Sequence, residues 1–129
     1  QHEIFGVPNH TGLSSILSGR SEANAIHHIP DLPSLYLLPV GTVPPNPLEL
    51  VQRAAFSLLM KELLSKFDHV VVDTPAAEHG ADARVLAAKC GAALVIARRG
   101  RTPMKPLRQL VGSVSKSPAT LAGVMINDY

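Results

Sequence analysis

Residues 92–126 read AALVIARRGRTPMKPLRQLVGSVSKSPATLAGVMI. Two apolar runs, 92–97 and 121–126, flank a segment, 103–114, whose apolar residues recur at helical spacing. Two parallel strands need a long crossover connection, which is usually a helix. The stretch therefore predicts two neighbouring parallel strands joined by a helix.

The same alternation extends toward the N-terminus. Residues 67–75, FDHVVVDTP, form a β-branched run that is apolar on both faces and is stopped by a proline, which is typical of a parallel strand covered by helices on both sides. A short helix is expected over 81–89. A longer helix is expected from Pro47 to Lys66, because Asn46 can serve as its cap and proline suits the first helical position.

The first half of the chain is rich in proline and predicts short elements joined by loops. We expect a short helix within 11–19, with a hydroxyl group as its N-cap and Gly19 in the left-handed position after it. Residues 35–41 are apolar and predict a buried strand, with Tyr36 inside it. Together these patterns predict an α/β fold, a doubly wound parallel sheet of about four strands, in a single domain over residues 1–129.

Composition excludes several classes of protein. The chain has 129 residues, 4% aromatic residues and a single cysteine, so a disulfide framework is excluded, and no apolar run is long enough for a transmembrane helix. Residues 1–83 hold four basic and nine acidic groups, whereas residues 84–129 hold eight basic groups and one acid. A basic region can attract phosphate, nucleic acid or acidic lipid. Nucleic acid is disfavoured, because no aromatic residue that could stack on a base lies between residues 68 and 128.

Polar residues follow each predicted strand, at the edge where open parallel sheets bind ligands. An aspartate at the end of an apolar strand, as Asp73 is, holds magnesium through water in nucleotide-binding proteins. Guanidinium groups such as that of Arg98 match phosphate oxygens. A strand-ending aspartate can also simply start a turn, and a basic loop can be a solvated surface, so both interpretations stay open. The candidate residues are Asp73 and Thr74, then Arg98, Arg99 and Arg101, then Asn127 and Asp128.

Other chemistries find little support. The six histidines are scattered or adjacent without an acid or cysteine at ligand spacing, and Cys90 is expected to be a small buried group at a helix end. No nucleophile elbow is present, and nothing matches the phosphate-loop pattern Gly-x-x-x-x-Gly-Lys-Ser/Thr. A magnesium-type aspartate without a phosphate loop indicates part of a nucleotide site.

Four segments, in order, resemble the bacterial tyrosine kinases, the cytoplasmic kinase domains of polysaccharide chain-length and export systems. The most specific is the third, in which a glycine is followed by Pro-Pro-Asn-Pro-x-Glu-Leu. The segments are HEIFG (2–6), GLSSILSG (12–19), LPVGTVPPNPLEL (38–50) and FDHVVVDTP (67–75).

The resemblance implies a P-loop NTPase-like fold and a parent domain that binds ATP and magnesium and phosphorylates tyrosines. By position, Asp73 matches the Walker B aspartate that supports magnesium through water, with Thr74 beside it. Asp82 matches an acid that often follows that strand, and Arg98 and Asn127 would lie at the nucleotide site. The implied partner is a membrane-embedded polysaccharide co-polymerase or activator, with self-association and without nucleic acid. The implied location is the cytoplasm, at the inner membrane.

The sequence also departs from this family. In the family, Walker A and a second aspartate motif precede the segment that here begins at Gln1, and neither is present. No tyrosine cluster is present, since Tyr129 stands alone. We therefore expect a C-terminal portion of such a domain, starting away from a natural N-terminus and unable by itself to bind ATP tightly. Two alternatives are a non-catalytic interaction module whose basic surface binds a partner or acidic lipid, and a fragment of a partition-type ATPase, against which the Pro-Pro-Asn-Pro segment argues.

Overall fold

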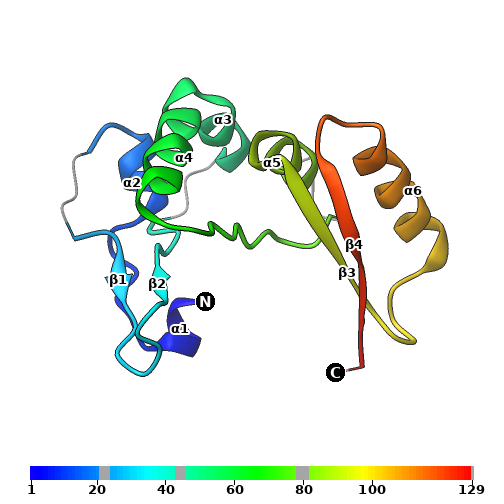
Figure 1. Ribbon diagram of the computed structural model, residues 1–129, viewed down its shortest axis with the longest axis horizontal. Helices are drawn as coiled ribbons and strands as arrows, with labels where there is room; N and C mark the ends of the chain where they lie inside the picture. The colour runs from blue at the N-terminus through cyan, green and yellow to red at the C-terminus, as the bar shows by residue number, and fades with distance from the viewer. Residues whose placement is uncertain (21–23, 43–45, 78–81, 129) are drawn as a thin grey trace. The chain divides into compact units, whose positions relative to one another are not determined.

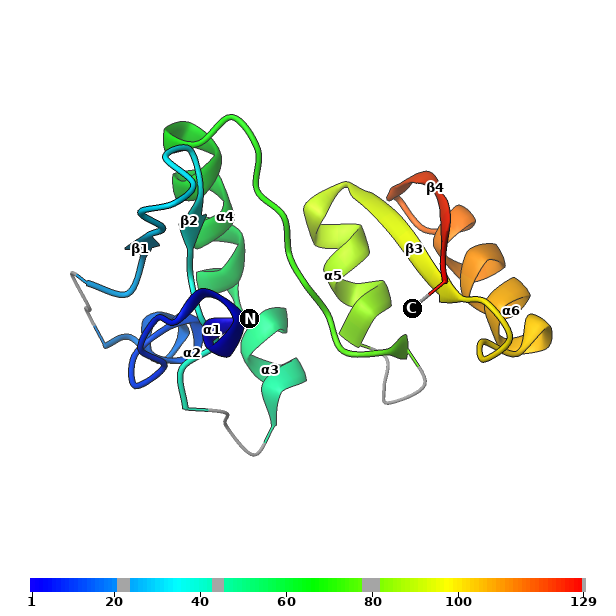
Figure 2. The ribbon, with the colours of Figure 1, turned by 90° about the horizontal axis from the view of Figure 1, so that it is seen from below.

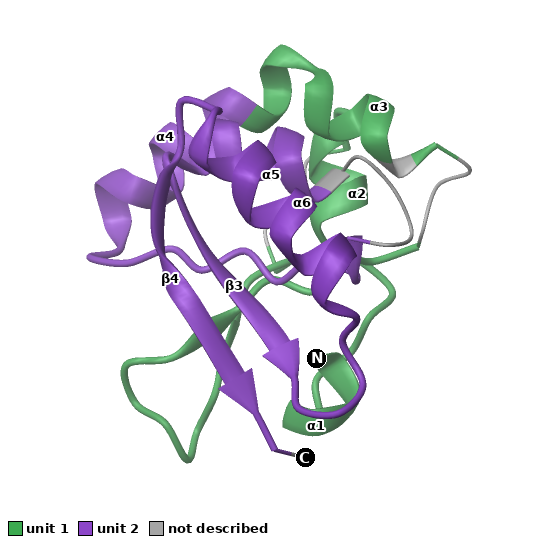
Figure 3. Ribbon diagram, turned by 90° about the vertical axis from the view of Figure 1, so that its right-hand side faces the viewer, with its two compact units in different colours: residues 1–56 green, residues 57–129 purple. Residues whose placement is uncertain are grey.

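The computed structural model describes residues 1–20, 24–42, 46–77 and 82–128, without the side chains of Pro47 and Asp82. The chain divides into two compact units, Gln1–Phe56 and Ser57–Tyr129 (Figure 3). The Pro44-Pro45 part of the Pro-Pro-Asn-Pro segment lies outside the described residues. That both units act as one domain stays a prediction.

The second unit contains the predicted strand–helix–strand. Strand β3 (Ala92–Arg98) pairs in parallel with β4 (Thr120–Asn127), and helix α6 (Met104–Ser115) connects them (Figure 1). Helix α5 (Asp82–Cys90) precedes β3, as the pattern over 81–89 predicts. These predictions are confirmed, with one irregularity in the pairing between Ala93 and Leu94.

Burial alternates along β3. Val95 is 7% exposed and Ala97 5%, whereas Leu94 is 52% exposed and Ile96 64%. The buried face packs under α5 and α6, which both contact β3. Among the described residues the β3–β4 sheet is thus covered on one face, and the expectation of helices on both faces is not met.

The predicted strand over 67–75 is wrong for this structure. After helix α4 (Ala54–Lys66) the chain runs on without pairing to any described strand, and the side chain of Val71 is 91% exposed. A strand needs a neighbouring strand for its backbone hydrogen bonds, so a strand-like sequence alone does not make a segment a strand. In the described part of the chain the predicted sheet of about four strands is therefore replaced by two sheets of two strands each.

The first unit is built from short elements, as its prolines predict. They are α1 (His2–Phe5), α2 (Leu13–Leu17), β1 (His27–His28), β2 (Tyr36–Leu37) and α3 (Pro47–Gln52). The buried strand predicted for 35–41 is wrong, because only Tyr36–Leu37 is a strand, antiparallel to β1, and Tyr36 is 47% exposed. Pro39 cannot donate to a ladder and limits the strand.

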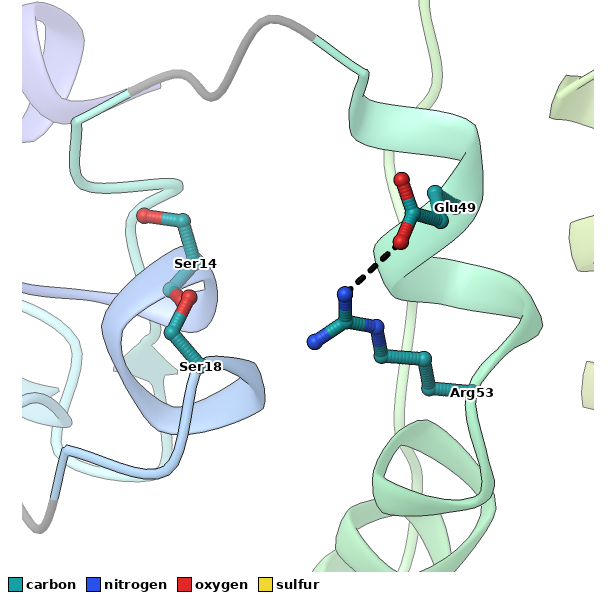
Figure 4. Close-up of polar contacts among 4 residues, drawn as sticks. All are labelled: Ser14, Ser18, Glu49 and Arg53. Atoms are coloured by element: carbon teal, nitrogen blue, oxygen red, sulfur yellow. Dashed lines mark hydrogen bonds and ion pairs between the residues drawn. The ribbon is translucent and has the colours of Figure 1, made fainter.

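Two helix predictions also need correction. The N-cap of α2 is Gly12, with no side-chain cap hydrogen bond, although Gly19 does take the predicted left-handed conformation. The helix predicted from Pro47 to Lys66 is divided into α3 and α4 at Arg53, whose backbone is extended. No proline or glycine explains this break. An ion pair of 2.7 Å from Arg53 to Glu49 spans the last turn of α3 (Figure 4).

Candidate functional site

The carboxyl ends of β3 and β4 place two of the predicted site residues side by side. Arg98 and Asn127 are partners in the parallel register, each at the last position of its strand. The backbone N–H of Arg99 donates to the carbonyl oxygen of Asn127 at 2.9 Å, which extends the pairing by one residue. Because ligands of open parallel sheets bind beyond this edge, the sheet brings Arg98 and Asn127 to the expected location.

A tight turn fixes the chain as it leaves β3. The N–H of Arg98 donates to Oγ1 of Thr102 at 2.8 Å, and the N–H of Thr102 donates back to the carbonyl of Arg98 at 2.9 Å. Gly100 has φ +66, a left-handed conformation that glycine adopts without strain. The turn therefore has a defined backbone, and its arginine side chains extend from it into solvent.

One of these arginines is neutralised within the chain. Nε of Arg99 lies 2.9 Å from a carboxylate oxygen of Asp128, and both side chains are largely exposed. Within the described residues, Arg98 and Arg101 form no ion pair. The edge therefore presents two guanidinium groups that could donate hydrogen bonds to phosphate oxygens, and a third that is bound to a carboxylate.

The structure does not join the other candidates to this edge. Asp73 is exposed and Thr74 half-buried on the extended segment that follows α4, and this segment is not hydrogen-bonded as a strand to β3 or β4. Asp82 begins α5, but its side chain lies outside the described residues. The binding roles assigned to all five of these residues, Asp73, Thr74, Asp82, Arg98 and Asn127, stay predictions.

Metal-ligating side chains and the thiol of Cys90 are the other candidates for a functional site in the described part of the chain. This part contains no group of three or more His, Cys, Asp or Glu side chains that could share a metal ion. Cys90 ends α5 and is half-buried, and burial raises the pKa of its thiol, which disfavours the reactive thiolate at neutral pH. His28 stacks at a tilt on Tyr36, with ring centroids 5.2 Å apart.

Sequence reasoning did not predict how two residues brace the β3–β4 edge. Thr102 holds the turn through its hydroxyl, and Asp128 holds Arg99. The sequence places Asp128 after a predicted strand, but its partner does not follow from the sequence, because the pairing depends on the register of the two strands. The signal for Thr102 was the Arg-Gly-Arg-Thr sequence of the loop, in which a hydroxyl can bond the backbone close by.

Sequence reasoning also did not predict a close backbone contact in the first unit. The contact joins residues 12–19 to residues 38–50, two of the segments that carry the family resemblance. The N–H groups of Leu13 and Ser14 donate to the carbonyls of Pro39 and Val40 at 2.9 and 3.0 Å. A Cβ atom on Gly12 would lie 2.2 Å from the carbonyl oxygen of Pro39. Only glycine fits at this position, so the close approach of the two backbones explains why the GLSSILSG segment begins with glycine.

Comparison with known proteins identifies the relatives of this fold. The chain is 30% identical over 127 residues to "Tyrosine-protein kinase ptk" of Acinetobacter johnsonii, across 98% of this chain and 17% of the relative. Among solved structures it matches "The kinase domain of Escherichia coli tyrosine kinase ETK" with a TM-score of 0.88 and 31% identity, across 98% of this chain and 49% of the other. The chain is a homologue of the bacterial tyrosine kinases.

A second solved structure agrees with this tyrosine kinase relationship. "Crystal structure of the chimerical protein CapA2B2" matches 98% of this chain at 30% identity, with a TM-score of 0.91, and the match covers 56% of that chain. The homologous region is thus about half the length of these two solved relatives. No protein-family model matches the chain. No helix of the described residues combines the length and the apolarity needed to cross a bilayer.

Proposed function

We propose that the chain is part of an ATP-dependent protein tyrosine kinase domain that serves exopolysaccharide biosynthesis or export. The observation that carries the proposal is similarity over nearly the whole chain to proteins named as tyrosine kinases, together with a TM-score of 0.88 to a tyrosine kinase domain. The proposed partner is a membrane-embedded polysaccharide co-polymerase or activator, with the kinase domain on the cytoplasmic side of the inner membrane and able to associate with further copies of itself.

The β3–β4 edge supports a phosphate-binding role within such a domain. Arg98 and Asn127 lie at the ends of adjacent parallel strands, and the turn after Arg98 is held by hydrogen bonds in both directions. A preorganised backbone and a guanidinium that forms no ion pair with any described residue suit an anionic ligand. We assign Arg98 to the phosphates of ATP and Asn127 to a position near the base.

Asp73 would support magnesium through water from the segment that precedes α5. Its carboxylate is exposed, and the segment around it has the apolar valines of a buried strand. We infer that this segment takes its place in a sheet beside a strand contributed by the portion of the kinase domain that the chain does not cover. Magnesium would then supply the charge neutralisation that phosphoryl transfer requires.

ATP affinity should depend on that remaining portion. The sequence of this chain holds no Gly-x-x-x-x-Gly-Lys-Ser/Thr pattern, whose backbone N–H groups and lysine cradle the phosphates in P-loop proteins. Two exposed arginines contribute little attraction by themselves, because water and salt screen exposed charges. We therefore propose that the 129-residue chain alone does not bind ATP tightly.

A chimeric kinase tests the proposed function. The chain replaces the matching segment of the Escherichia coli tyrosine kinase domain, and incorporation of phosphate from labelled ATP into tyrosine is measured. The chimera should be active. Asp73→Asn should lower the rate of phosphate incorporation about 10- to 100-fold, which is the usual cost of losing a residue that contacts a metal ion through one of the metal's own ligands, here a bound water.

Asp68→Asn is the matched control, because Asp68 is also exposed in the same extended segment and the substitution removes the same charge. It should leave the rate within about twofold, since most surface substitutions have small effects. A folded chimera without kinase activity, or equal losses from both substitutions, would contradict the proposal.

A further inference from the structure

The outer side of α6 carries a line of cations. Lys105, Arg108 and Lys116, the last directly after the helix, are spaced by about one turn and then about two turns, so they lie along one side. All three are exposed, and none belongs to an ion pair within the described residues. The sequence holds no acidic residue from 83 to 127, so nothing on α6 or the strands beside it offsets this charge.

The N-terminal end of this α6 stripe is also slightly hollowed. A shallow depression is lined by Met104, Lys105, Arg108 and Gln109, and Met104 is 59% exposed. Arg101, in the turn that leads into the helix, adds another exposed cation close by in sequence. Figure 2 shows α6 beside the β3–β4 pair, and the helix contacts both strands. The apolar side of α6 lies opposite the stripe of cations and faces these strands.

We propose that this stripe, Lys105, Arg108 and Lys116 with Met104, binds the surface of an anionic lipid bilayer. Clusters of lysine and arginine on a helix are recognised by anionic headgroups, and each cation strengthens binding about fivefold. The apolar side of α6 packs on its own sheet, so the helix lies on the headgroups and does not insert. A thioether such as that of Met104, at the N-terminal edge of the stripe, can dip among the headgroups.

Charge complementarity favours a lipid surface over a protein partner. Protein interfaces centre on aromatic or aliphatic anchors in desolvated pockets, and lysine is depleted from them. The α6 stripe has two lysines, one arginine and a single exposed apolar residue, and it lacks aromatic residues. A planar array of anionic headgroups requires only the distributed positive charge that the stripe supplies. The inference does not depend on the proposed kinase function.

Sedimentation of the 129-residue chain with lipid vesicles tests this inference. The chain should sediment with vesicles that contain phosphatidylglycerol and not with vesicles of phosphatidylcholine alone. The triple variant Lys105→Gln, Arg108→Gln, Lys116→Gln should weaken binding about a hundred-fold, and Lys105→Arg with Lys116→Arg should preserve it. Raising the salt concentration should weaken binding of the unmodified chain, because it screens exposed charges.

The matched control removes three exposed cations elsewhere, Arg20→Gln, Lys61→Gln and Arg84→Gln, and should bind nearly as well as the unmodified chain. Circular dichroism should show that both triple variants keep their helical content. Equal losses from both triple variants would contradict the proposal, because net charge alone would then explain binding. Equal sedimentation with both kinds of vesicle, or binding to an acidic peptide without binding to anionic vesicles, would also overturn it.

Discussion

Strand β3 and the segment 67–75 have similar sequences and different structures. Both are apolar runs that end in a polar residue, Arg98 in one and Asp73 in the other. β3 pairs with β4, and Val95 at its centre is 7% exposed, whereas the other run forms no ladder with any described strand and Val71 is 91% exposed. The difference shows that an apolar, β-branched run makes a segment able to form a strand. The segment forms one only where a neighbouring strand pairs with it.

The neighbour of β3 is close in the sequence, and the neighbour of 67–75 is not in the described chain. A crossover of one helix, α6, brings β4 back beside β3. The solved tyrosine kinase relatives are about twice as long as the region they share with this chain. We propose that the additional length provides the strand that pairs with 67–75.

Introducing a charge at equivalent places of the two runs gives the largest expected contrast. Val95→Asp places a carboxylate in the packed face of β3 and should lower the free energy of unfolding by about 3 to 5 kcal/mol, because nothing there compensates its charge. Val71→Asp should change it by less than about 0.5 kcal/mol, because the side chain is already in solvent. Urea denaturation followed by circular dichroism measures both values.

An effect of Val71→Asp as large as that of Val95→Asp would show that 67–75 is packed in solution. The proposed difference between the two runs would then be wrong. Amide hydrogen exchange gives an independent reading of the same difference, with slow exchange expected in β3 and fast exchange in 67–75.

Two glycines extend the contrast between packed and open positions. Gly12→Ala should cost about 1 to 3 kcal/mol, because the new Cβ would lie 2.2 Å from the carbonyl oxygen of Pro39 and the backbone must move. Gly112→Ala should stabilise the chain by about 0.5 to 1 kcal/mol. A Cβ on Gly112, which lies within α6, would have no atom within 4 Å other than those of its chain neighbours and of the helix backbone around it, and alanine is the better helix former. Thermal unfolding of the two variants should therefore shift in opposite directions. A stable Gly12→Ala variant would refute the close contact of the two loops.

The ion pair at the β3–β4 edge should contribute less. Arg99 and Asp128 are 73% and 59% exposed, so a double-mutant cycle with Arg99→Ala and Asp128→Ala should give a coupling energy of about 0.2 to 1 kcal/mol. The coupling should decrease in high salt. A coupling that is much larger, or that salt does not change, would mean that this edge is shielded from solvent.

Cys90 should show the smallest effect, as a dependence on pH. Burial raises the pKa of its thiol in the folded state above the value in the unfolded chain. The folded state therefore holds the proton more tightly, and this contribution to stability is present at neutral pH and lost as the pH rises through the raised pKa. Alkylation of Cys90 should be slower in the native chain than in urea over the pH range just above the ordinary thiol pKa. Equal rates would show that the thiol is not buried.

Local patterns predicted the β3–α6–β4 part of the second unit well, because its contacts are close in the sequence. The apolar alternation of β3, the period of α6 and the parallel return of β4 all follow from residues 92–126. The break at Arg53 and the open face of Leu94 and Ile96 depend on packing that no local pattern encodes. For the candidate site, strand-end placement located Arg98 and Asn127 correctly. The same rule predicted Asp73 beside them, and the structure does not place it there, because 67–75 pairs with no strand of the described chain.

Titration of the chain with Mg-ATP by calorimetry is the most direct test of the account. Its central claim is that this chain carries one part of a nucleotide site, the edge of Arg98 and Asn127, and depends on the rest of a kinase domain for the phosphate cradle. The account predicts no binding of Mg-ATP in the micromolar range by the 129-residue chain. Micromolar affinity would contradict it, because the chain would then bind ATP without the rest of a kinase domain.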